Sequence, residues 1–595
     1  MLLVTSFCLL AINSFTFAAT IPRSDALQHG QPAVVQRQAT STRVADSACT
    51  NGPLTRNCWS SGLSVATDFD AKAPPAGKVR THNLEITNTT ANPDGNGAQL
   101  AMLINGQYPG PTIIADWGDT LSITVKNSLQ DNGTSIHWHG IRQLNSCHYD
   151  GVNGVTECKQ IRPIAPGQSK TYTFKCTQFG TTWYHSHHSA QYGDGVVGTI
   201  IINGPATANY DYDLGTLPIT DWYYEPAFML NERAQHSLVG PPNASNILVN
   251  GTMKNANGGG SYFKMTATKG KKYRIRLINT SVDSFLHVSL DGHPFTVITS
   301  DLVPIKPYVT DQIAINIGQR YDVIINANQT VDNYWFRVGL GTDCGHNDIL
   351  ASGVQVGAIF HYGGASDAEP TTSGVALKTT CADETNLTPW VSNTVPSAPL
   401  QSTLKEFALD FHIDSSQNNL FRWLVNGSDM KVNWGKPTLQ YILDSDTAYA
   451  NKSNVFEMSV ANGWYYWWIQ TTGAFGLPHP IHLHGHDFYI VGRGDNVWDG
   501  NTASLAFTNP TRRDVATLPA GGYLILAFPA DNPGAWLMHC HIAWHASQGL
   551  SVQFLERKSE IKPALGDVSS VTDGCASWNS WWNGPHAYGQ TDSGL

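Results

Sequence analysis

Short runs of apolar residues, bounded by turn residues, recur along this 595-residue chain. The runs are rich in β-branched and aromatic residues and lie between Gly, Pro, Asn and Asp, whereas amphipathic helical periodicity is scarce. The clearest are 121–127 (LSITVKN), 171–176 (TYTFKC), 198–204 (GTIIING), 286–292 (LHVSLDG), 321–327 (YDVIINA) and 522–528 (GYLILAF). Short strands separated by turns are typical of β-sandwiches, so the pattern predicts an all-β fold.

Two polar, turn-rich stretches divide the chain. One spans 204–213 (GPATANYDYD), and the other spans 363–374 (GGASDAEPTTSG) and continues to about residue 400. They predict three consecutive sandwich domains at 46–204, 205–375 and 401–565, with a linker at 376–400 and a C-terminal extension at 566–595. An internal echo, GHPF at 292–295 and GHDF at 485–488, is a faint sign that the last two domains repeat one unit.

The N-terminal 45 residues are expected to be removed from the mature protein. The apolar run 2–12, broken only by Thr5 and Ser6, precedes small residues near position 19 and predicts a signal peptide at 1–19, although no basic residue precedes it. The run is too short to span a bilayer, and no other stretch is long enough. The polar segment 20–45 is interpreted as a propeptide, with Arg37 and Arg43 as candidate processing points.

Cysteines and sequons agree with export. Of ten cysteines, Cys8 leaves with the signal peptide and Cys540 lies between histidines, which leaves an even eight for disulfides in an oxidising compartment. Only Cys49 and Cys58 are close enough in sequence to suggest a local bridge. Nine candidate N-glycosylation sites are Asn88, Asn132, Asn243, Asn250, Asn279, Asn328, Asn386, Asn426 and Asn451.

The charge balance excludes one class of partner. The net charge is −10, and Lys and Arg form no cluster, so the chain offers no basic surface to nucleic acid. A mildly acidic surface favours neutral or cationic small molecules. The sequence therefore predicts small-molecule partners, with no nucleic-acid or membrane partner.

Four H-x-H pairs stand out among the 22 histidines: His137/His139, His185/His187, His482/His484 and His539/His541. Residues two apart in a strand project from one face, so each pair can present two imidazoles to one place. Imidazole suits copper, zinc, iron and nickel, and the spacing alone does not choose among them. One such pair is more often surface or core histidine than ligand, but four pairs in two distant clusters predict a multinuclear metal site.

The last pair encloses a cysteine. In His539-Cys540-His541 the strand period sends the thiol to the face opposite both imidazoles, so Cys540 must serve a different metal ion. His545 lies five residues further on, and His479 opens the segment 479–486 (HPIHLHGH). Two imidazoles and one thiolate form the blue-copper arrangement for single-electron transfer. The sequence thus predicts an electron-entry site joined covalently to a site that collects several electrons.

Other interpretations of these residues fit less well. Cys540 as a buried free thiol or half-cystine leaves its two flanking histidines unexplained. A zinc hydrolase needs three ligands and an open position, which gives no reason for eight paired histidines and a thiolate. No G-x-S-x-G, P-loop or H-E-x-x-H motif is present.

Four segments resemble those of the multicopper oxidases, specifically the laccases of ascomycete fungi: 137–151 (HWHGIRQLNSCHYDG), 180–191 (GTTWYHSHHSAQ), 479–486 (HPIHLHGH) and 539–550 (HCHIAWHASQGL). The likeness extends from about Cys49 to the C-terminus. The family implies three consecutive cupredoxin-like Greek-key β-sandwich domains, with a trinuclear copper cluster between the first and the third.

The resemblance assigns eleven residues to four copper ions, one of type 1, one of type 2 and two of type 3. The type 1 ligands are His479, Cys540 and His545. The type 2 ligands are His137 and His482. The type 3 ligands are His139, His185 and His541 for one ion and His187, His484 and His539 for the other. His188 and His486 lie beside the motifs, and we expect them to have packing or supporting roles.

Four further residues take roles from the resemblance. Leu550 falls at the axial position of the type 1 site, where a residue without a donor atom favours Cu(I) and raises the reduction potential. Asp150 resembles the acid near the trinuclear cluster, and Asp283 the acid that holds a phenolic hydroxyl or amine at the type 1 pocket. The tail 592–595 (DSGL) resembles the ascomycete tail that folds into the solvent channel, where Asp592 would assist proton delivery.

The resemblance also implies disulfide pairs: Cys49–Cys58, Cys158–Cys575 and Cys344–Cys381. It leaves Cys147 and Cys176 outside the three-bridge pattern, and we expect a fourth bridge between them.

The implied function is a secreted laccase that oxidises phenols and aromatic amines one electron at a time and reduces O2 to water. A ferroxidase would need several carboxylates at the type 1 site, where only Asp283 is visible, and an ascorbate oxidase is the other multicopper alternative. A copper carrier explains the type 1 ligands but not the paired histidines, and it would bind one copper instead of four. A monomer is favoured. Pigment formation, lignin degradation and detoxification all remain open as the biological role.

Overall fold

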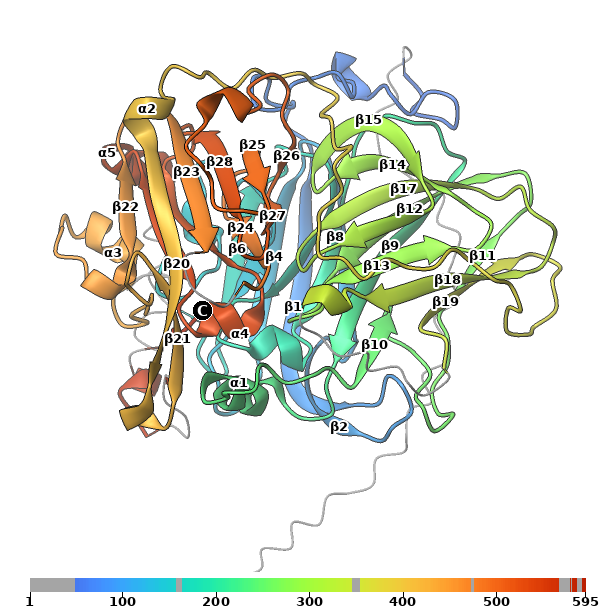
Figure 1. The fold of residues 1–595 in the computed structure, drawn as a ribbon, viewed down its shortest axis with the longest axis horizontal. Coiled ribbons are helices and arrows are strands. Elements are labelled where there is room, and N and C mark those ends of the chain that lie inside the picture. Colours follow the sequence, from blue (N-terminus) through green and yellow to red (C-terminus); the bar gives the residue numbers. More distant parts are fainter. Residues whose placement is uncertain are drawn as a thin grey trace, which may run out of the picture. The chain divides into compact units, whose positions relative to one another are not determined.

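The computed structural model describes residues 49–156, 163–344, 354–471, 476–566, 578, 580–585 and 591–595. The expected signal peptide and propeptide lie outside these residues, as do Cys158 and Cys575. In the described part, six β-sheets form three β-sandwiches in succession along the chain (Figure 1). The predicted all-β class is confirmed.

The first sandwich contains two four-stranded sheets. One has the order β2 (Gln99–Ile104), β1 (Val79–Ala91), β4 (Thr120–Asn127), β6 (Ser169–Lys175). The other has the order β3 (Gly110–Asp116), β8 (Val197–Asn203), β7 (Gly180–Ser186), β5 (Ile136–Trp138). In β4 every second residue is buried, as the period of a strand requires, and Ile123 shares one core with Ile200 of the facing sheet.

The middle sandwich has a six-stranded and a five-stranded sheet. The larger has the order β10 (Asn246–Val249), β9 (Tyr212–Trp222), β12 (Lys272–Asn279), β17 (Arg320–Asn326), β14 (Phe295–Ser300), β15 (Val303–Thr310). The smaller has the order β11 (Lys264–Ala267), β19 (Gly357–Tyr362), β18 (Asn333–Leu340), β13 (Leu286–Leu290), β16 (Gln312–Ile315).

The last sandwich repeats this plan. Its larger sheet has the order β21 (Leu420–Val425), β20 (Leu404–Asp414), β23 (Trp464–Thr471), β28 (Tyr523–Pro529), β25 (Phe488–Gly494), β26 (Arg512–Arg513). Its smaller sheet has the order β22 (Val455–Met458), β30 (Ser551–Glu556), β29 (Gly534–Cys540), β24 (His479–Leu483), β27 (Val515–Leu518).

The middle and last sandwiches therefore share one strand order, element for element. The echo between 292–295 and 485–488 falls at equivalent places, the turn from β13 to β14 and the turn from β24 to β25. This agreement supports the internal repeat. The metal-ligand pattern is not repeated, because the middle segment LHVSLDGH (286–293) has Ser289 and Asp291 where the last has His482 and His484.

Helices are short and lie between the strands. The α-helices are α1 (Ala227–Gln235), α2 (Leu400–Thr403), α3 (Thr438–Leu443), α4 (Ala543–Ser547) and α5 (Lys558–Leu565). The 3-10 turns are η1 (Ser60–Gly62), η2 (Cys147–Tyr149), η3 (Gln191–Asp194), η4 (Thr342–Cys344), η5 (Ser415–Gln417), η6 (Asn451–Ser453) and η7 (Thr502–Ser504). No helix in the described residues is long and apolar enough to cross a membrane.

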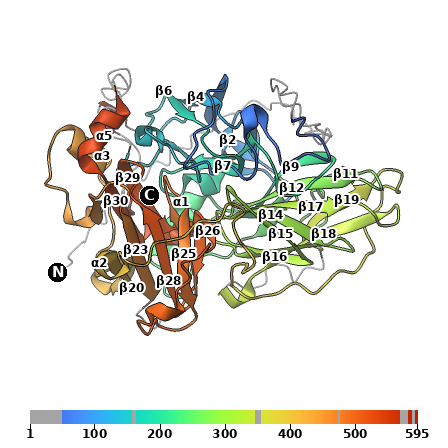
Figure 2. The same ribbon diagram turned by 90° about the horizontal axis from the view of Figure 1, so that it is seen from above.

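The three sandwiches meet in buried polar contacts. Thr181 donates to Asp322 across the first and middle sandwiches (2.6 Å), and Arg320 donates to Asp514 across the middle and last ones (2.5 Å). His139 Nε2 lies 3.2 Å from the same Asp514 carboxylate and links the first sandwich to the last. Figure 2 shows the first sandwich (blue to cyan) against both others. Buried charges need partners, so these contacts fix the junction around Asp514.

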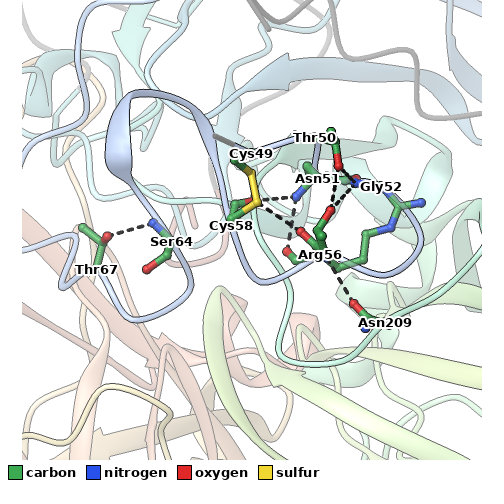
Figure 3. The surroundings of a disulfide bond; sticks show 10 residues. Cys49, Thr50, Asn51, Gly52, Arg56, Cys58, Ser64, Thr67 and Asn209 are labelled. Atoms are coloured by element: carbon green, nitrogen blue, oxygen red, sulfur yellow. Dashed lines mark hydrogen bonds between the residues drawn. A yellow bond between two sulfur atoms is a disulfide. The ribbon is translucent and has the colours of Figure 1, made fainter. Parts of the chain in front are cut away.

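Two of the expected disulfides are present: Cys49–Cys58 and Cys344–Cys381. Figure 3 shows how side chains hold the loop that the first one closes. Asn51 donates from Nδ2 to the carbonyl of Cys58 (2.8 Å), and Asn209 accepts from the backbone nitrogen of Arg56 (3.1 Å). The Cys49–Cys58 disulfide and these two hydrogen bonds therefore attach the start of the described chain to the connection between the first two sandwiches.

The expected Cys147–Cys176 bridge is wrong. Cys176 is a buried free thiol in the core of the first sandwich, whereas Cys147 packs in a separate cluster with Trp536 of the last sandwich. The two side chains belong to different cores, so the even number of cysteines did not predict their pairing. The Cys158–Cys575 pair lies outside the described residues.

Candidate metal centre

The four H-x-H pairs occupy equivalent places in four strands. In each pair the first histidine lies in a strand (β5, β7, β24 or β29) and the second is the first residue beyond its end. The strand register places His137 opposite His185 and His482 opposite His539. The pairs of the first and last sandwiches thereby face one space from two sides.

Eight histidines from these pairs form three groups whose nitrogen atoms lie within 4.8 Å of one another. The groups are His137, His139 and His482; His139, His185 and His541; and His187, His484 and His539. The structure therefore brings together the expected type 2 pair and both expected type 3 triads. Three of the H-x-H pairs divide their rings between two groups, whereas His137 and His139 share the first group and His139 also belongs to the second.

Backbone carbonyls fix the protonated nitrogen of four of these eight rings. His137 Nδ1 donates to the carbonyl of Asp150, His185 to that of Ser186, and His482 to that of Asp514, each at 2.9 Å. Their Nε2 atoms have no hydrogen-bond partner among the described residues. A ring held in this way offers its other nitrogen as a lone pair, which is the usual arrangement of a metal-bound histidine.

The contact between the His484 and His539 rings indicates that a cation binds here. His484 Nε2 lies 3.3 Å from His539 Nε2, although both rings already donate through Nδ1, one to Asp150 and the other to the Cys540 carbonyl. Two lone pairs therefore face each other with no proton between them. Burial, followed by the neighbouring rings, lowers the pKa of His484 far below its ordinary value, so protonation does not relieve the contact. A metal ion bound by the two nitrogens would relieve the contact.

The predicted type 1 residues form a compact triangle. Cys540 Sγ lies 3.6 Å from His479 Nδ1 and 3.5 Å from His545 Nδ1, and the two nitrogens are 3.1 Å apart. All three side chains are buried. Burial raises the pKa of the Cys540 thiol and lowers that of His479 to about 3. A thiolate in this apolar place is stabilised by a bound metal ion, so the set fits copper.

Cys540 joins the two metal sites through the chain. It ends β29, and its amide nitrogen donates to the carbonyl of Leu550 (3.1 Å). Its own carbonyl accepts from His539 Nδ1 (2.8 Å). The expected separation of thiol and imidazoles is thus realised, with the type 1 triangle on one side of the strand and His539 and His541 on the other.

Leu550 is buried directly before β30, and its backbone is hydrogen-bonded to two members of the type 1 triangle, Cys540 and His545. Together with Ile481, Met538 and Val425 it lines a small apolar cavity of about 10 Å³. The leucine side chain has no donor atom, and this cavity leaves some room beside it.

Methionine at position 550 is expected to lower the reduction potential of the type 1 copper. A thioether stabilises Cu(II) relative to Cu(I). We expect a fall on the order of 60 mV, which corresponds to a tenfold change in a one-electron equilibrium. A redox titration of the blue absorption measures it. Leu550→Ile, which adds no donor, is the control, and an unchanged potential in Leu550→Met would contradict the axial assignment.

Asp150 contacts the trinuclear histidines from the first sandwich. Its Oδ2 accepts from His484 Nδ1 (2.9 Å), its backbone carbonyl accepts from His137, and Oδ1 has no hydrogen-bond partner in the described part of the chain. The sequence-based expectation placed this acid near the cluster, and the structure places it there.

Asp514 occupies the corresponding position in the last sandwich, and sequence reasoning missed it. Its backbone carbonyl accepts from His482 and its carboxylate from His139, so it repeats the two contacts of Asp150 with the two sandwiches exchanged. Unlike Asp150, it binds a guanidinium, that of Arg320. Burial raises the pKa of Asp514 to about 7, and Arg320 opposes the rise. The signal in the sequence was the charged run RRD (512–514) before an apolar strand.

Asp283 lies in the loop between β12 and β13 and is buried. The carbonyl of the preceding Val282 accepts from the backbone nitrogen of Ala543 (2.9 Å), which places this loop against α4, the helix that carries His545. Asp221 holds the loop by accepting from the backbone nitrogens of residues 282, 283 and 284. Burial, then the Asp221 charge, raises the pKa of Asp283 well above its usual value.

The C-terminal tail is buried beside α4 and α1, which lie side by side (Figure 1). Asp592 accepts from Ser189, two residues beyond the ligand His187, and from Asn231 of α1 (3.1 Å). Ser593 donates from its backbone nitrogen to the carbonyl of Ser547 (2.8 Å). Asp592 thus lies next to the segment that carries His185 and His187, and burial raises the pKa of Asp592.

The remaining candidate residues divide by burial. His188 stacks on Trp434 (4.5 Å between ring centroids), and His486 pairs with Glu556 (2.9 Å), as expected for supporting roles. Asn279 is buried, and its amide donates to the carbonyls of Ser284 and Ile315, so that sequon is closed to a glycan in the folded protein. The exposed sequon asparagines are Asn88, Asn243, Asn328, Asn386, Asn426 and Asn451.

Comparison with known proteins agrees with this geometry. Three multicopper oxidase family models match residues 85–207, 213–365 and 416–560. Laccase-3 of Botryotinia fuckeliana is 53% identical over 75% of this chain and 100% of its own length. The laccase of Neurospora crassa is 46% identical over 92% of this chain and 89% of its own. The chain therefore belongs to the multicopper oxidase family, and within it to the fungal laccases.

Solved structures give the same result. The crystal structure of the laccase from Botrytis aclada is 44% identical, covers 92% of this chain and 100% of its own, and superposes with a TM-score of 0.86. A leucine-to-methionine mutant of that laccase gives a TM-score of 0.85 at the same identity and coverage. The three sandwiches are cupredoxin-like domains, and four copper ions are the cofactors of this family.

Proposed function

We propose that this laccase oxidises phenols and aromatic amines one electron at a time beside His545 and reduces O2 to water at the trinuclear centre. The observation that carries the proposal is the covalent junction at Cys540, which joins a buried His2Cys triangle to eight converging imidazoles. When bound, the copper ions supply the one-electron steps and the reduction of O2.

The residues of the chain divide the remaining work. Cys540 links the two metal sites through one residue on each side, which makes the path between them short. Burial of the type 1 triangle and of the trinuclear histidines excludes water from both. The protein thereby confines oxidation of the organic substrate to one place and O2 chemistry to another.

Asp283 is proposed to take the proton that a phenol loses as its electron leaves. The loop that carries it is held against α4, and Tyr223 and Trp544 pack nearby with ring centroids 5.9 Å apart. Because its pKa is raised, Asp283 is protonated at low pH and accepts a proton only as the pH rises. Phenol oxidation should therefore increase with pH through this ionisation.

Asparagine at position 283 is expected to remove that pH dependence. Without a base, kcat/KM for a phenol should fall about tenfold to a hundredfold and lose its rise with pH. Ferrocyanide, which has no proton to lose, should be oxidised at the original rate and serves as the control. Equal losses for both donors, or an unchanged phenol profile, would contradict the assignment of Asp283.

Aerobic oxidation of a simple phenol tests the proposed function directly. The expected stoichiometry is four phenols per O2, without peroxide, by protein that contains four copper ions per chain. No O2 uptake by the copper-loaded protein would overturn the proposal. Faster turnover of Fe2+ than of any phenol would favour a ferroxidase in its place.

Three further expectations belong with this proposal. Secretion rests on the signal-like residues 1–19 and on the exposed sequons, and detection of a glycosylated protein in the medium tests it. A monomer is expected, and light scattering tests it. The domain limits 46–204, 205–375 and 401–565 stay predictions, which limited proteolysis at 376–400 addresses.

A further inference from the structure

Within the described residues the middle sandwich contributes no histidine to the metal groups, yet it reaches them through Arg320. This residue begins β17, and its guanidinium is fully buried. Nη1 and Nη2 donate to the two carboxylate oxygens of Asp514 at 2.5 and 2.6 Å. Nε donates to the carbonyl of Thr181 in β7, and Nη1 also donates to the carbonyl of Gly318. One side chain thus binds all three sandwiches.

Asp514 depends on this contact for its orientation. The carboxylate has to present an oxygen to His139 Nε2 while its backbone carbonyl serves His482 Nδ1. These two rings stack on each other with centroids 3.8 Å apart and belong to neighbouring metal groups. The carboxylate keeps the proton of His139 on Nε2, so that Nδ1, which faces His541 Nε2 at 3.3 Å, is free to bind a metal. A rotation of the carboxylate would remove this constraint on the His139 ring.

The backbone at Gly140 and Gly318 packs closely against the Arg320–Asp514 ion pair and the His139 ring. Gly140 follows His139 with φ of +72°, and a Cβ there would lie 2.5 Å from Arg320 Nη2 and 2.6 Å from Asp514 Oδ2. Gly318, with φ of +82°, would bring a Cβ within 3.0 Å of His139 itself. Only glycine at these two positions therefore leaves space for the ion pair and for the His139 ring.

Asp301 binds the backbone of both members of this ion pair. It accepts from the backbone nitrogens of Arg320, Asp514 and Val515 (3.0, 3.0 and 3.2 Å) and from the Arg513 guanidinium. The backbone of Asp514 is thereby fixed to the middle sandwich separately from its side chain. Loss of the Arg320 fork would disturb the carboxylate and leave this backbone contact in place.

We propose that Arg320 is a positioning residue for the trinuclear centre, because it orients the Asp514 carboxylate that holds His139. The middle domain takes part in the centre through this residue. The inference rests on copper binding by the family and is independent of the substrate proposed above.

Arg320→Lys is the decisive variant. Lysine keeps the positive charge but cannot donate to both carboxylate oxygens in a fixed fork. We expect the copper held by His139, a type 3 ion in the assignment above, to be bound 10-fold to 100-fold more weakly, the usual effect of losing a partner behind a metal ligand. After dialysis against a graded chelator, the variant should retain three coppers where the parent retains four. The type 3 ion left without its partner should then add a new EPR signal, while the type 2 signal and the blue absorption per chain do not change.

Arg274→Lys is the matched control. Arg274 is a buried arginine of the same sheet, bound to Asp322 and Tyr210, and within the described residues it has no hydrogen bond to Asp514 or to a histidine. The variant should retain four coppers and an unchanged EPR spectrum. Wild-type chelator resistance and EPR in Arg320→Lys would overturn the proposal. Parallel loss of the type 1 and type 2 signals would also overturn it, because it would assign Arg320 to general stability.

Asp514→Asn provides a second test if Arg320→Lys does not accumulate. The carboxamide keeps one acceptor oxygen and replaces the other with an NH2 donor, so it can no longer accept from both arms of the Arg320 fork. The same selective loss of the copper at His139 is expected. An unchanged copper content and EPR spectrum in this variant, or failure of both variants to fold while Arg274→Lys folds, would reject the positioning role.

Discussion

Cys540→Ser is expected to abolish phenol oxidation together with the blue absorption. A serine hydroxyl is neither readily ionised nor soft, so it does not replace the thiolate of the His2Cys triangle. The loss of kcat should be on the order of a thousandfold or more, equivalent to about 4 kcal/mol of barrier. The trinuclear histidines keep their carbonyl and carboxylate partners in this variant. Three coppers per chain and an unchanged type 2 EPR signal should therefore remain.

Cys176→Ser is the matched control for that experiment. Cys176 is also buried, but it lies in the core of the first sandwich, away from the metal groups. It should keep the blue absorption and the phenol activity even if its melting temperature falls. Phenol turnover by Cys540→Ser at the parent rate would refute electron entry at this site.

Asp150→Asn is expected to slow O2 reduction by about a hundredfold to a thousandfold while leaving reduction by phenol intact. The amide oxygen can still accept from His484, so the metal ligands stay in place, but the side chain can no longer relay a proton. Loss of a positioned proton donor typically costs this much. The type 1 copper should then stand bleached during steady turnover, because electrons enter faster than they leave.

Two rapid-mixing measurements separate the half-reactions of Asp150→Asn. Anaerobic mixing with phenol should bleach the blue absorption at the parent rate, which is the internal control. Mixing the fully reduced variant with O2 should restore the absorption slowly. Reoxidation at the parent rate across the pH range would remove Asp150 from proton delivery and leave Asp592, which binds Ser189 near the cluster, as the acid to test next.

The residues of the metal centre were predictable because their signals are local. A strand has a period of two, so the spacing of His539, Cys540 and His541 already separates the thiol from the two imidazoles. The even spread of short apolar runs likewise predicted the sandwiches. The resemblance then assigned each histidine to one group, and the structure brings those groups together.

Signals that depend on one sandwich packing against another were weaker or missing. Asp514 contacts His139 across 375 positions of sequence, and the charged run at 512–514 marks a buried charge without naming its partner. The expected Cys147–Cys176 bridge was wrong because parity counts cysteines without knowing which core each one enters. Asn279 carries a sequon, yet burial and two hydrogen bonds occupy its amide.

The sequence by itself determined the chemistry of this protein: which donor atoms exist, how they are paired, and that one thiolate adjoins two imidazoles. These properties follow from covalent order and the strand period. The tertiary structure alone decided how the pairs divide among the metal groups and which acids hold the rings. It also decided that a domain without ligands reaches the centre through Arg320. Those choices depend on three separately folded sandwiches meeting, because only their packing sets the distance between residues hundreds of positions apart.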